Sequence, residues 1–230
     1  EISKHKFQNE ILIGTGCNSL KENINLMRHA IELGCNTFLI GNPAYYKNDD
    51  AGVYDFYSNI IKEVPECEIV LYNFNKLMGY TFSVDIVKKL VNEYGNNVIG
   101  FKDSSGNLWD NLRLPNFSMF VGSEAKLLKA LEKNCAGCIS ATTQITYYLA
   151  KKVYEDFKNK VEQTVNDRLV KVRTTFDKYN LISAVHTFLS QKDIKYKRLL
   201  PPLALLSSEK EQEFLNKLKE LNFIPKKIAA

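Results

Sequence analysis

Six short apolar segments, rich in β-branched and aromatic residues, alternate with stretches of helical periodicity in the first 141 residues. This alternation constrains the fold more than any other feature of the chain. A strand followed by a helix and a further strand forms a parallel sheet with helices packed on it. The predicted strands are residues 11–15, 36–41, 68–73, 98–102, 119–123 and 137–141.

Helical periodicity separates most of these strands and dominates the rest of the chain. Between the strands we predict helices over 20–33, 52–64, 83–94 and 124–133, with Ser83 as the N-cap of the third. After residue 141 the helical segments follow one another with no clear strand, which predicts a helical cap or bundle. These segments are 145–160, 161–178, 181–190 and 208–221.

Polar or reactive side chains stand at the carboxyl end of every predicted strand. A β/α barrel builds its active site on this one face from several strands. An open doubly wound sheet concentrates its site at one switch point. The pattern therefore favours the α/β barrel over the open sheet. The residues concerned are Thr15, Asn18, Asn42 through Tyr46, Tyr72, Asn73, Lys102 through Ser105, Ser123 and Ser140 through Thr143.

Composition excludes several classes of function. The net charge is +5, but it is dispersed and no basic stripe is interleaved with aromatic residues, so nucleic acid is not an expected partner. No apolar stretch approaches the ~18 residues of a membrane span, so we expect no membrane partner. The five cysteines are an odd number set mostly in apolar segments, which indicates reduced thiols and a cytoplasmic protein.

Metal and nucleotide motifs are incomplete. The pair Cys135 and Cys138 forms a CxxC with no second CxxC or histidine pair to complete a zinc site, so no metal is expected. The segment GTGCNS at 14–19 lacks the third glycine of a dinucleotide fingerprint, and no Walker lysine follows it. A nucleotide-binding α/β domain is therefore a weak alternative.

Lys102 ends an apolar strand and admits two interpretations. It could be a strand-end lysine paired with Asp103, or a nucleophile that forms a Schiff base. An amine attacks a carbonyl only when unprotonated, and apolar surroundings favour that form. Tyr72 ends the preceding strand, where its phenol could relay protons, although it could equally be a core tyrosine with a satisfied hydroxyl.

The loop residues near these strand ends are less specific. Tyr45 and Tyr46 could be packing or interface residues, or one could reach a reaction centre in its own or a neighbouring subunit. The small polar residues after Lys102, among them Ser104, are expected to shape that loop. Gly79 is expected to be a turn glycine.

In register along the chain, six segments resemble the dihydrodipicolinate synthase / N-acetylneuraminate lyase family of Schiff-base lyases. The match covers roughly residues 8–205, and six segments in the family's order are highly specific. They are ILIGTGCNS, GNPAYYK, VLYNFNKLMG, VIGFKDSSGN, FVGSEAKLL and GCISATTQ.

This resemblance implies roles for individual residues. Lys102 takes the place of the lysine that forms an imine with pyruvate or a 2-oxo acid, and Tyr72 that of the family's proton-relay tyrosine. Tyr45 aligns best with the loop tyrosine that reaches into the neighbouring subunit's site, with Tyr46 second. Ile139 aligns with an isoleucine whose backbone lines the substrate pocket, and we expect Ser104 and Tyr46 to contact substrate as well.

The resemblance also implies a fold and an assembly. We expect a (β/α)8 TIM barrel with a C-terminal helical domain, built into a homo-oligomer, a dimer or a tetramer. Residues 1–160 would form the partial barrel with the active site, and 161–230 the helices that complete it. The family's first β/α units and their Gly-Thr-Thr turn have no counterpart here, so we expect the 230 residues to be part of a longer protein.

The expected function is a lyase or synthase without cofactor that condenses pyruvate with an aldehyde, or cleaves a 2-oxo acid to pyruvate. One departure bears on the second substrate. Where the family's synthases have an arginine that contacts a carboxylate, this chain has Leu77, and Asn75 replaces a proline. That favours a related aldolase, such as a 2-keto-3-deoxy sugar acid aldolase, over dihydrodipicolinate synthesis. A non-catalytic homologue that binds a 2-oxo acid is the remaining alternative.

Overall fold

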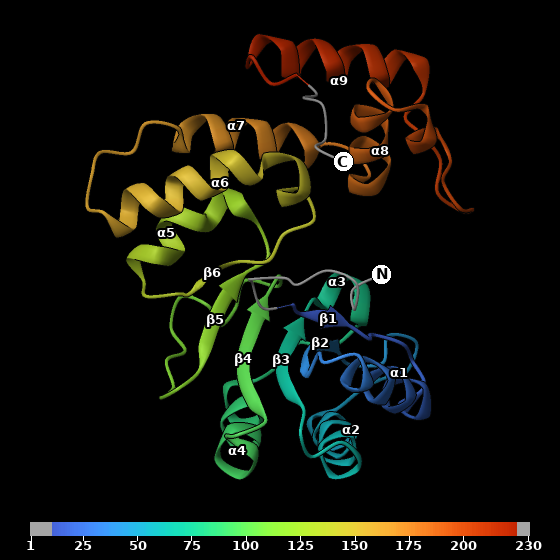
Figure 1. Cartoon of the computed structure of the whole chain (residues 1–230), viewed down its shortest axis with the longest axis vertical. Coiled ribbons are helices and arrows are strands. Elements are labelled where there is room, and N and C mark those ends of the chain that lie inside the picture. The colour runs from blue at the N-terminus through green and yellow to red at the C-terminus, as the bar shows by residue number, and fades with distance from the viewer. Residues whose placement is uncertain (1–10, 225–230) are drawn as a thin grey trace. The chain divides into compact units, whose positions relative to one another are not determined.

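The computed structural model describes residues 11–224 (Figure 1). Its contacts divide the chain into two compact units. The first ends at Gly122 and takes in Lys133–Gly137. The second consists of Ser123–Glu132 and the chain from Cys138 onward. The division at residues 160 and 161 stays a prediction.

The first unit alternates strands and helices, as the sequence predicts. Most bounds fall within two residues of those expected, and β3 coincides with its predicted range. The elements are β1 (Ile13–Gly14), α1 (Leu20–Glu32), β2 (Thr37–Gly41), α2 (Asp50–Glu63), β3 (Glu68–Asn73), α3 (Asn75–Met78), α4 (Val84–Tyr94), β4 (Val98–Asp103) and β5 (Ser118–Val121). The last strand, β6 (Gly137–Cys138), is shorter than the predicted 137–141.

The strands lie in sequence order, β1-β2-β3-β4-β5-β6, and β1 to β5 pair in parallel (Figure 1). A sequential order with right-handed crossovers places every connecting helix on the same face. Accordingly, α2 packs against both α1 and α4. This winding is that of a β/α barrel, whereas a doubly wound sheet reverses its strand order. The described residues form six strands of the eight that close such a barrel.

The helices of the first unit begin at side chains that cap them. The Ser83 hydroxyl accepts a hydrogen bond from the Ile86 N–H at 3.3 Å, which confirms the predicted N-cap of α4. Ser19 and Asp49 cap α1 and α2 in the same way. Gly79 ends α3 with φ 65°, a left-handed conformation that favours glycine, so the turn predicted there is confirmed.

Large apolar side chains fill the space between the sheet and its helices. Phe38 and Ile40 of β2 and Phe101 of β4 are fully buried. The buried phenol of Tyr57 on α2 donates a hydrogen bond to the Ile40 carbonyl at 2.9 Å, which ties the helix to the end of β2. This packing fixes the carboxyl ends of the strands, where the predicted site lies.

The second unit is helical after β6 and has a core of its own. Leu169, Val172, Phe176 and Phe214 are completely buried in it. Residues 161–165 lie outside the helix predicted over 161–178, and the short turn η3 was not predicted. The elements are η2 (Glu124–Lys126), α5 (Leu127–Glu132), α6 (Thr143–Lys158), α7 (Asn166–Phe176), α8 (Leu181–Ser190), η3 (Ile194–Lys197) and α9 (Ser208–Glu220). None of the helices described between residues 11 and 224 is long and apolar enough to cross a membrane.

Candidate active site

Strands β3 and β4 bring Tyr72 and Lys102 together at the carboxyl end of the sheet. The two residues are register partners, so their side chains project from the same face. The Lys102 Nζ atom lies 3.8 Å from the centroid of the Tyr72 ring, and Lys102 is only 8% exposed. The apolar strand therefore places its amine against the phenol of its neighbour.

Tyr72 holds its proton more tightly than an ordinary tyrosine. Burial raises the pKa of its phenol, and a hydrogen bond with the Ser104 side chain acts in the opposite direction. The phenol is therefore protonated at neutral pH and can donate a proton to a group beside Lys102. Ser104, expected to shape the loop and contact substrate, touches the tyrosine as well.

Gly122, which we did not single out, makes room for Ser104. A Cβ atom at Gly122 would lie 2.0 Å from the Ser104 Oγ and 2.8 Å from its Cα. The Gly122 N–H also donates a hydrogen bond to the Asp103 carbonyl at 3.1 Å. The missing side chain at the end of β5 thus lets the loop after Lys102 pass close by.

Asp103 organises that loop from the opposite face of β4. Adjacent residues of a strand point to opposite faces, and the Asp103 carboxylate accepts hydrogen bonds from the Asn73 amide at 3.0 Å and from the Gly106 N–H at 2.8 Å. It also accepts from the backbone N–H groups of Leu108 and Trp109, at 2.8 and 2.9 Å. The aspartate that a structural interpretation would pair with Lys102 is therefore engaged by loop donors.

A glycine and a methionine border Tyr72 on its other side. Gly41, at the end of β2, is the register partner of Tyr72. A Cβ atom at Gly41 would lie 2.4 Å from the Met78 Cε and 3.9 Å from the Tyr72 Cδ1. The Met78 thioether on α3 therefore fills the space beside the tyrosine that a side chain at position 41 would take. The neighbouring Leu77 is 67% exposed. Neither Gly41 nor Met78 was predicted as a site residue.

The loop tyrosines lie apart from this packing. Tyr45 and Tyr46 follow β2 and are 86% and 59% exposed. Their rings contact each other edge to face, with centroids 5.7 Å apart. Asn48 donates hydrogen bonds from its amide to the Pro43 and Tyr46 carbonyls, both at 2.8 Å, and so fixes the loop. Both phenols are thus presented outward on a defined turn.

Ile139 belongs to the second unit, between β6 and α6, where a buried carboxylate holds its neighbours. Glu124 is fully buried and accepts hydrogen bonds from the hydroxyls of Ser140 at 2.5 Å and Thr146 at 2.8 Å, and from Thr142. Arg173 Nη1 lies 3.1 Å from the same carboxylate. These contacts fix the backbone that follows Ile139.

Opposing influences act on the Glu124 carboxyl. Burial raises its pKa, but the hydrogen bonds from Ser140 and Thr142 and the positive charge of Arg173 outweigh burial, and the net pKa is lowered. Glu124 is therefore charged at neutral pH. The sequence indicated Glu124 only as part of a motif, because its partner Arg173 lies on a distant helix.

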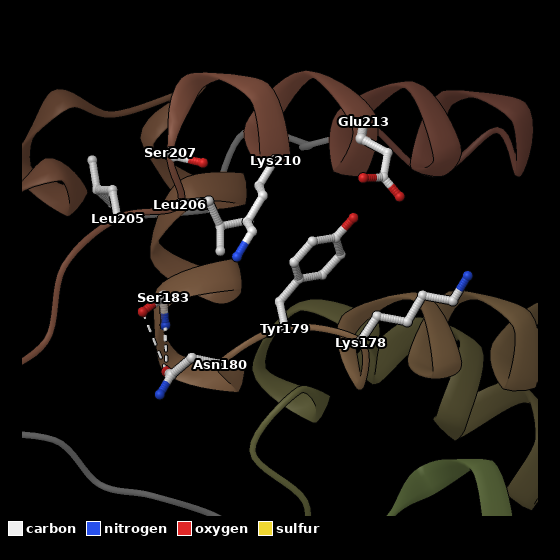
Figure 2. Close-up of a pocket in the computed structure, with 9 residues that line it drawn as sticks. All are labelled: Lys178, Tyr179, Asn180, Ser183, Leu205, Leu206, Ser207, Lys210 and Glu213. Carbon is white, nitrogen blue, oxygen red and sulfur yellow. Dashed lines mark hydrogen bonds between the residues drawn. The ribbon is translucent and has the colours of Figure 1, made fainter.

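The second unit also contains a cavity of about 470 Å³, between the start of α8 and the start of α9 (Figure 2). The Asn180 amide oxygen accepts hydrogen bonds from Ser183 within it, and the Tyr179 phenol points toward Glu213 (Figure 2). Burial, then the charge of Glu213, raises the pKa of Tyr179. None of the predicted site residues lines this cavity.

Within residues 11–224 no three His, Cys, Asp or Glu side chains are grouped so that they could hold a metal ion. The five cysteines all carry free thiols. Cys135 is buried, and burial raises the pKa of its thiol.

A sequentially wound parallel sheet with a buried lysine and a tyrosine at its carboxyl end defines a protein of the β/α-barrel class. Comparison of the sequence with family profiles then gives the family. The profile of the dihydrodipicolinate synthetase family matches residues 3–221, and the chain belongs to this family.

Curated relatives agree with this assignment. The chain is 29% identical to an uncharacterized DapA-like lyase of Chloroflexus aurantiacus, over 90% of its own length and 72% of the relative's. It is 27% identical to a 4-hydroxy-tetrahydrodipicolinate synthase of Hydrogenobaculum, over 97% and 79%. A match to the corresponding synthase of Acaryochloris marina spans 55% of that protein.

Solved structures share the fold. Dihydrodipicolinate synthase from Thermotoga maritima superposes with a TM-score of 0.86 at 20% identity, over 97% of this chain and 80% of that one. A prophage protein of the dihydrodipicolinic acid synthase family from E. coli gives a TM-score of 0.81 at 22% identity, over 94% and 76%. These likenesses support the barrel winding of the sheet.

Proposed function

We propose that the chain is the catalytic part of a lyase or synthase in which Lys102 forms an imine with pyruvate. The contact of the Lys102 amine with the Tyr72 ring carries the proposal, because a nucleophilic amine and a protonated phenol share one buried face of the sheet. The E. coli relative was solved in complex with pyruvate, which supports the same 2-oxo acid here.

The proposed chemistry balances without a cofactor or a metal. The Lys102 amine attacks the ketone carbon of pyruvate, and the carbonyl oxygen leaves as water when the C=N bond forms. Loss of a methyl proton gives an enamine, whose carbon bonds to the aldehyde carbon while the aldehyde oxygen takes up a proton. Water then hydrolyses the imine, which releases a 4-hydroxy-2-oxo acid and restores the amine. Cleavage of such an acid to pyruvate runs these steps in reverse.

Tyr72 is the proposed proton carrier in these steps. Its phenol can give a proton to the departing carbonyl oxygen and recover one later. Tyr45, and second Tyr46, would assist from the loop after β2, and their high exposure suits a contact with a neighbouring subunit's site. Ser104 and the Ile139 backbone complete the proposed substrate contacts.

The second substrate is an aldehyde, and the residue at position 77 bears on the chemistry of its far end. Leu77 stands where synthases of the family have a carboxylate-binding arginine, and a leucine cannot form that contact. We therefore favour an aldolase, with 2-keto-3-deoxy sugar acids among its candidate substrates, over dihydrodipicolinate synthesis.

The oligomeric state and the cellular location form part of the same proposal. We infer a closed eight-stranded barrel with a C-terminal helical domain, in a homodimer or homotetramer. The matched curated relatives are longer, since the chain spans 50% to 79% of their length. The free thiols of all five cysteines support a reducing, cytoplasmic setting.

Reductive trapping tests the proposal. The protein is incubated with pyruvate, treated with borohydride, digested and analysed by mass spectrometry. We expect a stable adduct on the peptide that holds Lys102, and none in the K102R variant. Reversible pyruvate binding without an adduct would instead identify a non-catalytic 2-oxo acid binder. Protection by nucleotides with no effect of pyruvate would identify a nucleotide-binding domain.

A further inference from the structure

We propose that Met78 selects the second substrate, and that this substrate is an aldehyde whose far end carries no charge. This inference rests on the proposed function of Lys102. It concerns how far the bound aldehyde extends from the imine, and which protein side chain its far end meets.

The strand register sets the direction in which the bound aldehyde extends from Lys102 and the distance that it covers. Gly41, Tyr72 and Lys102 are successive register partners on β2, β3 and β4 and share one face of the sheet. Neighbouring strands are about 4.8 Å apart, so Gly41 lies about 10 Å from Lys102. A chain of four to six carbons that extends from the imine past Tyr72 would end above β2.

Met78 is the side chain at that end. Its Cε and Sδ atoms lie 2.4 and 2.6 Å from the position that a Gly41 Cβ would occupy, and the Tyr72 ring is within 4 Å of the same point. The glycine therefore admits the thioether to the surface beside the tyrosine. No side chain at position 41 stands between Met78 and that surface.

The turn that carries Met78 is anchored at both ends. The Asn75 N–H donates a hydrogen bond to the Ser105 Oγ at 2.9 Å, and the Asn42 amide donates one to the Met78 carbonyl at 3.3 Å. The turn then ends at Gly79, whose φ of 65° allows the sharp change of direction. Because of these anchors, the methionine has a defined place in the free protein.

The chemistry of the turn favours an uncharged ligand. A thioether has no strong donor for a carboxylate, and Leu77 beside it has none at all. Lys76, the cation of this turn, is exposed and lies two positions before Met78. Successive helical residues are separated by about 100°, so Lys76 is about 200° away around the turn, on the side opposite to Met78. A carboxylate that reached Met78 would therefore lose water without gaining a partner.

A matched pair of aldehydes tests the inference. Butanal and 4-oxobutanoate have the same chain length and differ in the carboxylate at the far end. Condensation with pyruvate is measured as pyruvate consumption, and kcat/KM is compared for the two aldehydes. We expect the protein to prefer butanal by about tenfold or more. A preference for 4-oxobutanoate would overturn the inference.

Variants separate a role in selection from a role in packing. M78K places an ammonium group at the position of the Met78 side chain. We expect it to shift the ratio of the two kcat/KM values toward 4-oxobutanoate by about tenfold or more. M78L should keep the preference for butanal. L26K adds the same charge at an exposed position of α1, and it should leave the ratio unchanged. An unchanged ratio in M78K would overturn the inference.

Pyruvate trapping keeps the two proposals distinct. If M78K still forms the Lys102 adduct, its fold and its imine chemistry are intact, and the aldehyde ratio decides the role of Met78. If M78K does not trap pyruvate, the preference of the unaltered protein for butanal or 4-oxobutanoate decides whether the inference stands. If the unaltered protein forms no adduct, the proposed function fails, and this inference fails with it.

Discussion

The Lys102 amine sits over the face of the Tyr72 ring, 3.8 Å from its centroid, because β3 and β4 pair these two residues directly. The face of an aromatic ring attracts a cation, so the tyrosine can hold the lysine in place before substrate arrives. The phenol at the edge of the same ring keeps its proton because burial raises its pKa. In the proposed reaction, one side chain would both position the amine and supply a proton.

Removing the Tyr72 hydroxyl should separate these two roles. Y72F keeps the ring beneath Lys102, so pyruvate should still be trapped by borohydride on Lys102. The steady-state rate should fall by about 10²- to 10⁴-fold, because the proton carrier is lost. Y54F removes an exposed hydroxyl on α2 and is the matched control. A Y72F rate within threefold of the unaltered protein would rule out Tyr72 as the proton carrier.

Gly122 should resist even the smallest side chain. A Cβ there would lie 2.0 Å from the Ser104 Oγ and 2.8 Å from the Ser104 Cα, so the loop after Lys102 would have to move. We expect G122A to lower the free energy of unfolding by about 1–3 kcal/mol and to slow turnover, since Ser104 contacts Tyr72. Urea denaturation and steady-state kinetics measure the two effects.

The control for G122A is another glycine of the same unit. A Cβ at Gly16 would meet nothing within 4 Å, so G16A should keep the free energy of unfolding within about 1 kcal/mol of the unaltered protein. Equal losses in G16A and G122A would show that the close approach of Ser104 does not set the requirement for glycine.

Asp103 should hold the loop that follows Lys102. D103N replaces a carboxylate that accepts from three backbone N–H groups and the Asn73 amide. We expect a loss of about 2–3 kcal/mol in the free energy of unfolding, with faster hydrogen exchange at Gly106, Leu108 and Trp109. D110N, which removes the charge of a partly exposed ion pair with Lys133, should cost less than about 1 kcal/mol. Unchanged exchange at those three amides would contradict this role.

The sequence predicts the Tyr72 and Lys102 pair but not what surrounds it. Both residues end apolar strands, and parallel strands collect their carboxyl ends at one edge, so their proximity follows from the alternating pattern. Met78 lies on a four-residue turn that is too short for helical periodicity, and nothing local indicates that its side chain returns over Gly41. A pattern shows which face a residue takes, but not which distant atom fills the space beside a glycine.

The same limit applies to the second unit. Helices α6 to α9 follow from their periodic apolar residues, and the structure has them near their predicted positions. The burial of Glu124 does not follow, because a charged residue after a strand is usually exposed. The buried Glu124 carboxylate is stabilised by Arg173 and by hydroxyl groups from another segment. Such a network is visible only once the chain is folded.

Acid should weaken the second unit through Glu124. The folded state lowers the pKa of this carboxyl, so its contribution to stability is present above the unfolded pKa of about 4.3 and is lost as pH falls through the folded value. At pH 7, E124Q should lower the free energy of unfolding by about 3 kcal/mol, because buried Arg173 loses a charged partner. The gap between the variant and the unaltered protein should narrow below about pH 4.3, since glutamine does not titrate. Urea denaturation at pH 7 and pH 3.5 measures both values. The double variant E124Q/R173M, which removes both charges, should recover part of the loss at pH 7. A gap that stays constant between the two pH values would show that the buried carboxylate is not the acid-sensitive group.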